Sequence, residues 1–167
     1  MTEGRSKRLV IDLEACDQCD RCAIECAYFY KPQPEDHGVL ALRESATFDL
    51  VCRRCRQASC IEACPCSALE RQPSGVIRRY NLRCVSCKSC AHACPFGTIY
   101  EDMLGFYRTP CDHCLSRSLD TAPPCVGSCR RGAIEYRLVD AEEPGVHIVD
   151  EHLAARAPKW LKQEAAS

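Results

Sequence analysis

Large aromatic side chains are scarce in this sequence, which contains one tryptophan and four phenylalanines among 167 residues. Apolar residues make up 46% of the chain, but this share includes 17 cysteines, so the residues that usually form a hydrophobic core are fewer than it suggests. A small core supplies little stability, and proteins with such a core often depend on bound metal or on disulfides. We therefore expect metal cofactors in the interior, and a chain that is largely unfolded or aggregation-prone without them.

Long apolar runs are also absent, since no stretch approaches the roughly eighteen apolar residues of a membrane-spanning helix. The segment MTEGRSKRLVIDLEAC shows neither the apolar centre nor the small-residue cleavage site of a secretory signal peptide. These two absences predict a cytoplasmic protein without a membrane span. In the reducing cytoplasm, clustered cysteines are metal ligands more often than disulfides.

Motifs of catalysis are missing as well, because the chain has no glycine-rich nucleotide loop, no zinc-protease motif and no nucleophile motif. The charges nearly balance, with 22 lysines and arginines against 23 aspartates and glutamates. Metal–thiolate centres would add negative charge, so the arginines near the cysteines have an evident electrostatic use and no nucleic-acid partner is expected. The sequence assigns no catalytic residue, so reaction chemistry is expected on another subunit.

Cysteines are what the chain has in abundance, and sixteen of the seventeen fall into four groups of four. The most regular group lies in CVSCKSCAHACP, residues 84–95, a C-x2-C-x2-C-x3-C-P run. In such a run three thiolates bind one [4Fe-4S] cluster and the fourth ligates a second cluster, so each run needs a partner run. The four groups are Cys16, Cys19, Cys22 and Cys26; Cys52, Cys55, Cys60 and Cys64; Cys84, Cys87, Cys90 and Cys94; and Cys111, Cys114, Cys125 and Cys129.

Other interpretations of the cysteines are weaker. Paired C-x2-C motifs also build zinc sites, but zinc requires neither a third cysteine at the same spacing nor the x3-C-P sequel. Disulfides fit poorly, because few thiol pairs in C-x2-C-x2-C satisfy disulfide geometry. The seventeenth cysteine, Cys66, is expected to be a small buried side chain, with a substitute ligand or a redox-sensitive thiol as the alternatives.

The segments between the cysteines predict short structural elements. A cysteine run followed by a strand or hairpin recurs four times, which indicates an internal repeat. Helix is expected over residues 20–30, and a frayed surface helix over residues 151–167. Short strands are expected at 8–13, 47–51, 68–70, 76–80, 98–100, 132–136 and 146–149.

The four cysteine groups resemble those of the four-cluster ferredoxin-type subunits of bacterial oxidoreductases. That family includes the electron-transfer subunits of dimethyl sulfoxide reductase, formate hydrogenlyase and carbon monoxide dehydrogenase systems. The resemblance covers residues 8–139 and all sixteen ligand positions. It implies an α+β fold of two nested dicluster ferredoxin-like modules, with short hairpins and short helices around the clusters. The implied domains are an outer module of residues 1–51 plus 105–150, an inner module of residues 52–104, and a C-terminal tail of residues 151–167.

The same resemblance implies four [4Fe-4S] clusters and their ligands, because partner runs in this family exchange their fourth cysteines. The fourth run departs from the family pattern, since ten residues separate its second and third cysteines and Arg130 replaces the usual proline. The implied ligand sets are Cys16, Cys19, Cys22 with Cys129; Cys111, Cys114, Cys125 with Cys26; Cys52, Cys55, Cys60 with Cys94; and Cys84, Cys87, Cys90 with Cys64.

The function implied is that of a non-catalytic subunit that relays single electrons through the four clusters. The runs LVCRRC and RCVSCKSCAHACPFGTIY are similar to the small subunits that accompany tungsten-containing aldehyde oxidoreductases and benzoyl-coenzyme A reductase complexes. The favoured partner is therefore a tungsten or molybdenum catalytic subunit, and a flavin subunit or further copies of this chain are additional candidates. The alternatives are a stand-alone polyferredoxin, or a redox or maturation factor for a hydrogenase, formate dehydrogenase or carbon monoxide dehydrogenase. A zinc-bound interaction scaffold is a third interpretation, which the identity of the metal would separate from the others.

Overall fold

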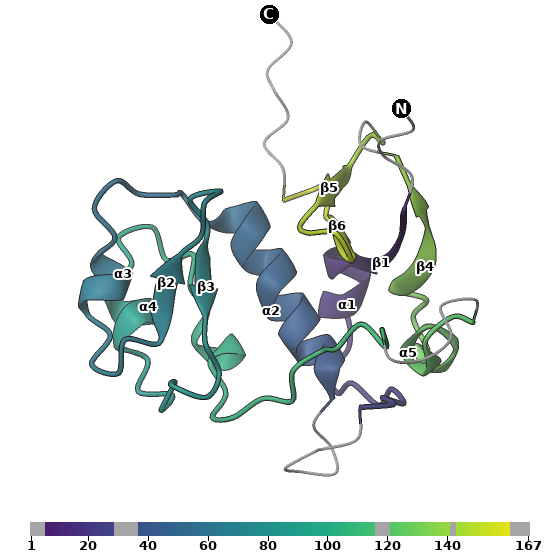
Figure 1. The fold of residues 1–167 in the computed structure, drawn as a ribbon, viewed down its shortest axis with the longest axis horizontal. Helices are drawn as coiled ribbons and strands as arrows, with labels where there is room; N and C mark the ends of the chain where they lie inside the picture. Colours follow the sequence, from purple (N-terminus) through teal and green to yellow (C-terminus); the bar gives the residue numbers. More distant parts are fainter. Residues whose placement is uncertain (1–5, 29–36, 116–120, 141–142, 161–167) are drawn as a thin grey trace, which may run out of the picture. The chain divides into compact units, whose positions relative to one another are not determined.

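A computed structural model of the chain describes residues 6–28, 37–115, 121–140 and 143–160. The chain divides into two compact units (Figure 1). One unit joins the two ends of the sequence, residues 1–27 and 112–167, and the other is the continuous segment 28–111. Within the described ranges, no helix is long and apolar enough to cross a membrane.

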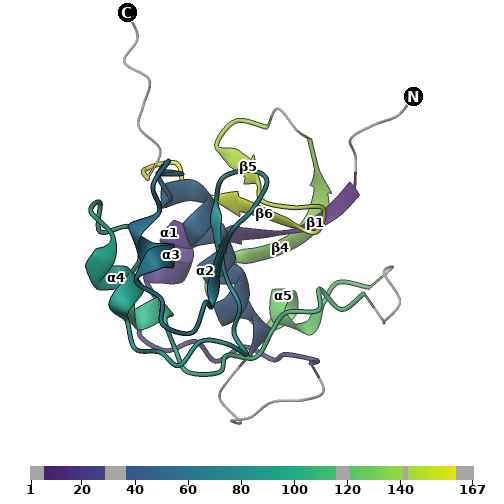
Figure 2. The same cartoon turned by 60° about the vertical axis from the view of Figure 1, so that its left-hand side comes forward.

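The unit formed by the chain ends contains a four-stranded sheet of order β4-β1-β6-β5 (Figure 2). Its strands are β1 (Ser6–Asp12), β4 (Ile134–Val139), β5 (Val146–Ile148) and β6 (Leu153–Arg156). Strand β1 pairs antiparallel with β4 and parallel with β6, and β5 pairs antiparallel with β6. The middle residues of the two central strands, Leu9–Ile11 of β1 and Leu153–Ala155 of β6, are apolar and buried, as expected for strand segments covered on both faces.

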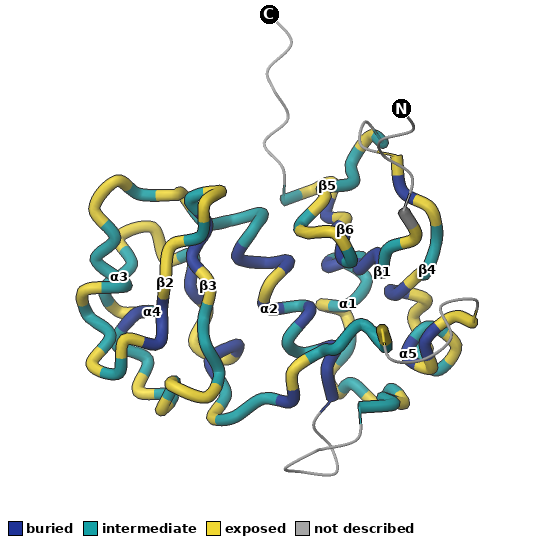
Figure 3. Tube along the Cα trace, in the orientation of Figure 1, coloured by how far each residue is buried: buried dark blue, intermediate teal, exposed yellow. Residues whose placement is uncertain are grey.

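Strand β6 corrects the prediction of a frayed helix in this part of the chain. Leu153, Ala154 and Ala155 are at most 1% exposed and pair in register with β1 (Figure 3). Alanine favours helix by intrinsic propensity, but burial between two strands outweighs that preference. Of residues 151–167, those from 161 onward lie outside the described residues.

The continuous unit is built from helix α2 (Gly38–Val51) and the hairpin of β2 (Leu69–Arg71) and β3 (Ile77–Arg79), with α2 packed against β3. The strand predicted over residues 47–51 is wrong, because these residues form the last turn of α2. Phe48 on that turn belongs to a buried core with Leu69, Ile77, Ile99 and Leu104. This core covers one face of α2, and that burial explains why residues 47–51 are helical and not extended.

Short helices supply the rest of the secondary structure. The helix predicted over residues 20–30 is wrong for residues 20–28, which contain none, and residues 29 and 30 lie outside the described ranges. The strand predicted over residues 98–100 is also absent. The mixture of helices and strands agrees with the predicted α+β class. The short elements are α1 (Leu13–Asp17), α3 (Ser59–Glu62), α4 (Ser89–Ala93), the 3-10 turn η1 (Glu101–Met103) and α5 (Pro124–Ser128).

Candidate iron–sulfur sites

Three of the four cysteine runs share one local structure. The third cysteine of each, Cys60, Cys90 or Cys125, is the second residue of a helix of four or five residues. The fourth cysteine follows within two residues of the helix end, where the chain turns away. The first run differs, because its described residues after α1 are irregular and only Cys16 lies in a helix. Asp12 caps that helix by accepting from the Ala15 amide at 2.9 Å.

One cavity of the continuous unit is lined by Cys84, Cys87 and Cys90 together with Cys64 from the preceding run. Its empty volume is about 350 Å³, part of which is open to solvent. Cys90 is buried and Cys87 is exposed, so the cavity extends from the core to the surface. The structure thus brings together the four cysteines of one implied ligand set. Cys66 lines the same cavity and is half-buried, not fully buried as expected.

A second cavity of the continuous unit is lined by Cys52, Cys55 and Cys60 together with Cys94. Its empty volume is about 420 Å³, with the same partial opening to solvent. Apolar residues of the core, among them Phe48 and Ile77, form its inner wall. The two cavities therefore exchange their fourth cysteines, Cys64 and Cys94, in the sense that the resemblance implies.

In the unit formed by the chain ends, Cys125 lies near Cys114 and near Cys26 of the first run. Burial, and after it the charges of these two thiols, raises the pKa of Cys125 to about 12. Hydrogen bonds also join the first run to the last: the Glu25 amide donates to Ser128 Oγ at 2.9 Å, and Arg131 donates to the Gln18 carbonyl at 3.2 Å. The remaining implied ligands, Cys16, Cys19, Cys22, Cys111 and Cys129, are all half-buried.

The cysteines surround cavities instead of converging on one point. Within the described ranges, no group of three or more His, Cys, Asp or Glu side chains is close enough to hold a single metal ion. Tetrahedral zinc with Zn–S bonds of about 2.3 Å needs sulfur atoms within about 3.8 Å of one another. A [4Fe-4S] cluster holds its four thiolates farther apart, because a cube of iron and sulfide lies between them. The spacing of the cysteines around the two cavities fits a [4Fe-4S] cluster and not a single zinc ion.

Comparison with known families distinguishes between zinc and iron–sulfur clusters. Residues 44–139 match the family described as the 4Fe-4S dicluster domain, and this match covers more than half of the chain. The chain belongs to the 4Fe-4S dicluster domain family. Iron–sulfur clusters are thus the cofactors for which this dicluster protein is built.

Three relatives show what share of this dicluster protein, and of each relative, is similar in sequence. UacF of Escherichia coli (strain K12), named as an oxidoreductase, is 32% identical over 143 residues, which are 81% of this chain but only 21% of UacF. YnfG of the same strain, named as a probable chain of anaerobic dimethyl sulfoxide reductase, is 28% identical over 148 residues, covering 78% of this chain and 72% of YnfG. The thiosulfate reductase electron transfer subunit PhsB of Salmonella typhi is 26% identical over 145 residues, covering 79% and 76%.

In this dicluster protein, hydrogen-bonding groups lie near the sulfur of the fourth cysteine in three of the runs. The Ala68 amide donates to Cys64 Sγ at 3.2 Å, and the Ala133 amide donates to Cys129 Sγ at 3.3 Å. The Thr98 hydroxyl lies 3.3 Å from Cys94 Sγ. In each case the donor is four residues after the cysteine. Donors at this distance stabilise a thiolate, which is the form that ligates iron.

The pKa values of the cysteine thiols differ according to how deeply each thiol is buried. Burial raises the pKa of Cys90 to about 11, and the nearby thiols of Cys64 and Cys84 add to the effect. Burial also raises the pKa of Cys60, with contributions from Cys94 and Cys52. At the surface, a hydrogen bond from Ser89 lowers the pKa of Cys87. Cys90 and Cys125, the third cysteines of their runs, are the two buried cysteines, and each would have to lose a proton to bind iron.

Two residues beside the first cavity were missed at the level of sequence. Arg79 lines that cavity and is ion-paired with Glu44 of α2. The signal was available in the strand pattern, because side chains alternate along β3 and the buried Ile77 places Arg79 on the inner face, whereas Arg78 faces solvent. For Glu44 the signal is weaker. Its neighbour Ser45 is also polar but exposed, and no local pattern separates the two positions.

Proposed function

We propose that this chain transfers single electrons through four [4Fe-4S] clusters, in the cytoplasm, between a catalytic oxidoreductase subunit and a second redox partner. The observation that carries the proposal is the pair of cavities in the continuous unit, each lined by all four cysteines of one implied ligand set, which come from two different runs. When bound, a [4Fe-4S] cluster supplies a site that gains or loses one electron. The chain itself supplies thiolates, hydrogen bonds and a low-dielectric wall.

The protein's own residues would fix the cofactors in three ways. Short helices hold the third cysteine of a run below the surface, where Cys90 and Cys125 are each 8% exposed. Donors four residues after the last cysteine orient its sulfur. Core residues such as Phe48 and Ile77 exclude water from one side of the cavity and so lower its dielectric constant. No residue is assigned a proton-transfer or nucleophilic role.

We extend the proposal to two nested dicluster modules with the sixteen ligands named from the sequence. The division of the chain into a continuous unit and a unit made from both ends supports nesting. The proximity of Cys125 to Cys26 supports a crossed fourth ligand in the outer module as well. For the set formed by Cys16, Cys19, Cys22 and Cys129, the support is the pair of hydrogen bonds between the first and last runs.

The partner we propose is a catalytic oxidoreductase subunit. Two of the relatives are named as a probable component of dimethyl sulfoxide reductase and as an electron transfer subunit of thiosulfate reductase, which supports a subunit role. A tungsten or molybdenum enzyme of the aldehyde oxidoreductase type is the specific candidate, and it rests on the sequence runs at residues 50–55 and 83–100 alone. A stand-alone polyferredoxin or a redox or maturation factor is the second candidate, and it also rests on the sequence alone.

Anaerobic purification with metal analysis tests the proposal. We expect a brown protein with about sixteen iron atoms per chain and [4Fe-4S] signals in electron paramagnetic resonance (EPR) after reduction. About eight irons would contradict the four-cluster proposal, and a colourless protein with stoichiometric zinc would contradict iron–sulfur function. An affinity pull-down from the native host then tests the partner. Co-elution of a large subunit with tungsten or molybdenum supports the specific candidate, and elution of the loaded chain alone supports the second candidate.

A further inference from the structure

A buried ion pair lies beside the cavity of Cys64, Cys84, Cys87 and Cys90. Arg79 donates from Nε to Glu44 Oε1 at 2.6 Å and from Nη2 to Oε2 at 2.5 Å. The side chains of Arg79 and Glu44 are only 3% and 9% exposed. Arg79 Nη1 also donates to the Gly105 carbonyl at 3.2 Å. Contacts with α2 and with the segment after η1 therefore fix the guanidinium in one orientation.

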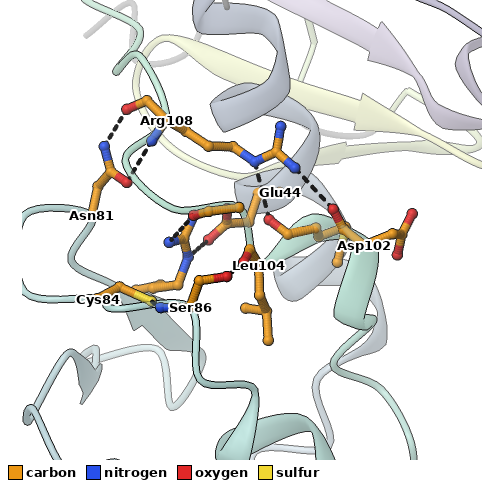
Figure 4. Close-up of polar contacts among 10 residues, drawn as sticks. Glu44, Asn81, Cys84, Ser86, Asp102, Leu104 and Arg108 are labelled. Carbon is orange, nitrogen blue, oxygen red and sulfur yellow. Dashed lines mark hydrogen bonds and ion pairs between the residues drawn. The ribbon is translucent and has the colours of Figure 1, made fainter. Parts of the chain in front are cut away.

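The guanidinium of Arg79 also interacts with Cys84. Burial lowers the pKa of Arg79, but hydrogen bonding and charge interactions, first with Glu44 and then with Cys84, raise it above its usual value. Arg79 and Cys84 line the same cavity, and Figure 4 shows Glu44 and Cys84 within one region of polar contacts. Cys84 thus lies next to a buried cation whose other side is occupied by a carboxylate.

The second cation on the wall of this cavity differs in its surroundings. The side chain of Lys88 is 41% exposed, and its Nζ lies 3.5 Å from Glu101 Oε2. Water and Glu101 screen the Lys88 charge, whereas the Arg79 charge acts through a poorly screened interior. Among the described residues that line the cavity, Arg79 is therefore the cation with the largest expected effect on whatever charge the cysteines hold.

Stability alone does not account for a buried pair of this kind. Removing two charges from water is costly, and well-packed apolar residues of similar volume often stabilise a core as well or better. A bidentate arginine–carboxylate pair does provide a charge of fixed position and orientation. Beside a redox centre, that charge changes the relative free energies of the oxidised and reduced states, because the reduced state carries one more negative charge.

We propose that the Arg79–Glu44 pair sets the reduction potential of the cluster bound by Cys64, Cys84, Cys87 and Cys90. This inference rests on the proposed function. Arg79 is a positioning residue that acts through Cys84, and its positive charge favours the reduced cluster. Glu44 holds the guanidinium against the cavity and offsets part of that charge.

The two members of the pair predict shifts of opposite sign, which a purely structural role would not produce. We expect Arg79→Gln to lower the potential of one cluster, and Glu44→Gln to raise the potential of the same cluster while keeping a hydrogen-bond acceptor for Arg79. Arg79→Lys keeps the charge and should restore much of the potential lost in Arg79→Gln. The measurement is an EPR-monitored redox titration of the anaerobic full-length protein, with iron content determined for each variant.

Arg83→Gln is the matched control, because Arg83 precedes Cys84 in the sequence but is 41% exposed and paired with Glu70 at 2.6 Å. Its removal should shift the potential less than Arg79→Gln does. Equal shifts from both variants, or shifts of the same sign from Arg79→Gln and Glu44→Gln, would overturn the inference. If Arg79→Gln fails to retain iron, the sign of the Glu44→Gln shift decides. Absence of iron from the wild-type protein would instead refute the proposed function.

Discussion

At the scale of the residue, Cys64 after α3 and Cys94 after α4 each connect one run to another. Cys64 and Cys94 each line the cavity of the neighbouring run's first three cysteines. If these cysteines are crossed ligands, the iron content of double cysteine variants can be predicted. Two cysteines that serve the same cluster act as a unit, whereas cysteines of different clusters act independently.

We expect Cys94→Ser to remove or convert one cluster, and the double variant with Cys55→Ser to lose little more iron than the single variant. The double variant of Cys94→Ser with Cys87→Ser should lose about twice as much, because a second cluster is affected. Iron analysis and EPR spin quantification of anaerobic samples give the result. The reverse pattern would contradict the crossed ligands. Cys66→Ser is the control and should keep the full iron content.

At the scale of the element, the start of α2 is packed against the segment that leads into the fourth cysteine run. A Cβ atom built on Gly38 would lie 3.0 Å from Cys111 Cα and 3.1 Å from the Pro110 carbonyl oxygen. These are backbone atoms that a side-chain rotation cannot relieve. The absence of a side chain at Gly38 therefore allows this close approach.

Gly38→Ala is expected to destabilise the protein by about 1–3 kcal/mol, because the added methyl group overpacks this contact. Its control is Gly127→Ala in α5, where nothing lies within 4 Å of the added Cβ. There, alanine should be neutral or should stabilise by about 0.5–1 kcal/mol through its helix propensity. Anaerobic denaturant titrations followed by circular dichroism compare the two variants. Equal destabilisation by both would show that the contact is unimportant.

At the scale of the whole molecule, the two units differ in how closely their cores involve cysteine. In the continuous unit, Cys52, Cys60, Cys64 and Cys94 pack directly against the core that contains Phe48 and related residues. In the other unit, the sheet has a core cluster of Val10, Val139 and Ala154, with Val146 packed against it and no cysteine included among its described members. Loss of the cofactors should therefore disturb the two units unequally.

We expect iron removal by an anaerobic chelator to abolish most amide protection in residues 52–98, while β1 and β4 keep part of theirs. Cofactor binding stabilises the cooperative unit that forms the site, and the described members of the sheet cluster include no cysteine. Hydrogen exchange followed by mass spectrometry resolves the two regions. Retained protection in residues 52–98 would contradict the view that cofactors complete this core. Reloading the protein with iron and sulfide is the control for irreversible damage.

Local sequence patterns predicted the parts of the fold that local forces determine. The short spacings within residues 52–60 and 84–90 specified which three cysteines of each run gather in the continuous unit, because thiols separated by so few residues share one loop. Strands β1, β2, β3 and β5 form within a residue or two of their expected positions. The sequence by itself also determined the family, since residues 44–139 match the 4Fe-4S dicluster domain.

Tertiary structure decided what depends on long-range burial. Residues 47–51 contain β-forming Thr47 and Phe48, yet they are helical because one face of α2 is covered by the hairpin core. Ala154 and Ala155 form a strand because β1 and β5 lie on either side of them. The neighbourhood of Arg79, Glu44 and Cys84 joins residues up to 40 positions apart, and no local pattern encodes such a contact. Short-range spacing thus grouped the cysteines into runs, whereas burial between distant segments determined the charges around them.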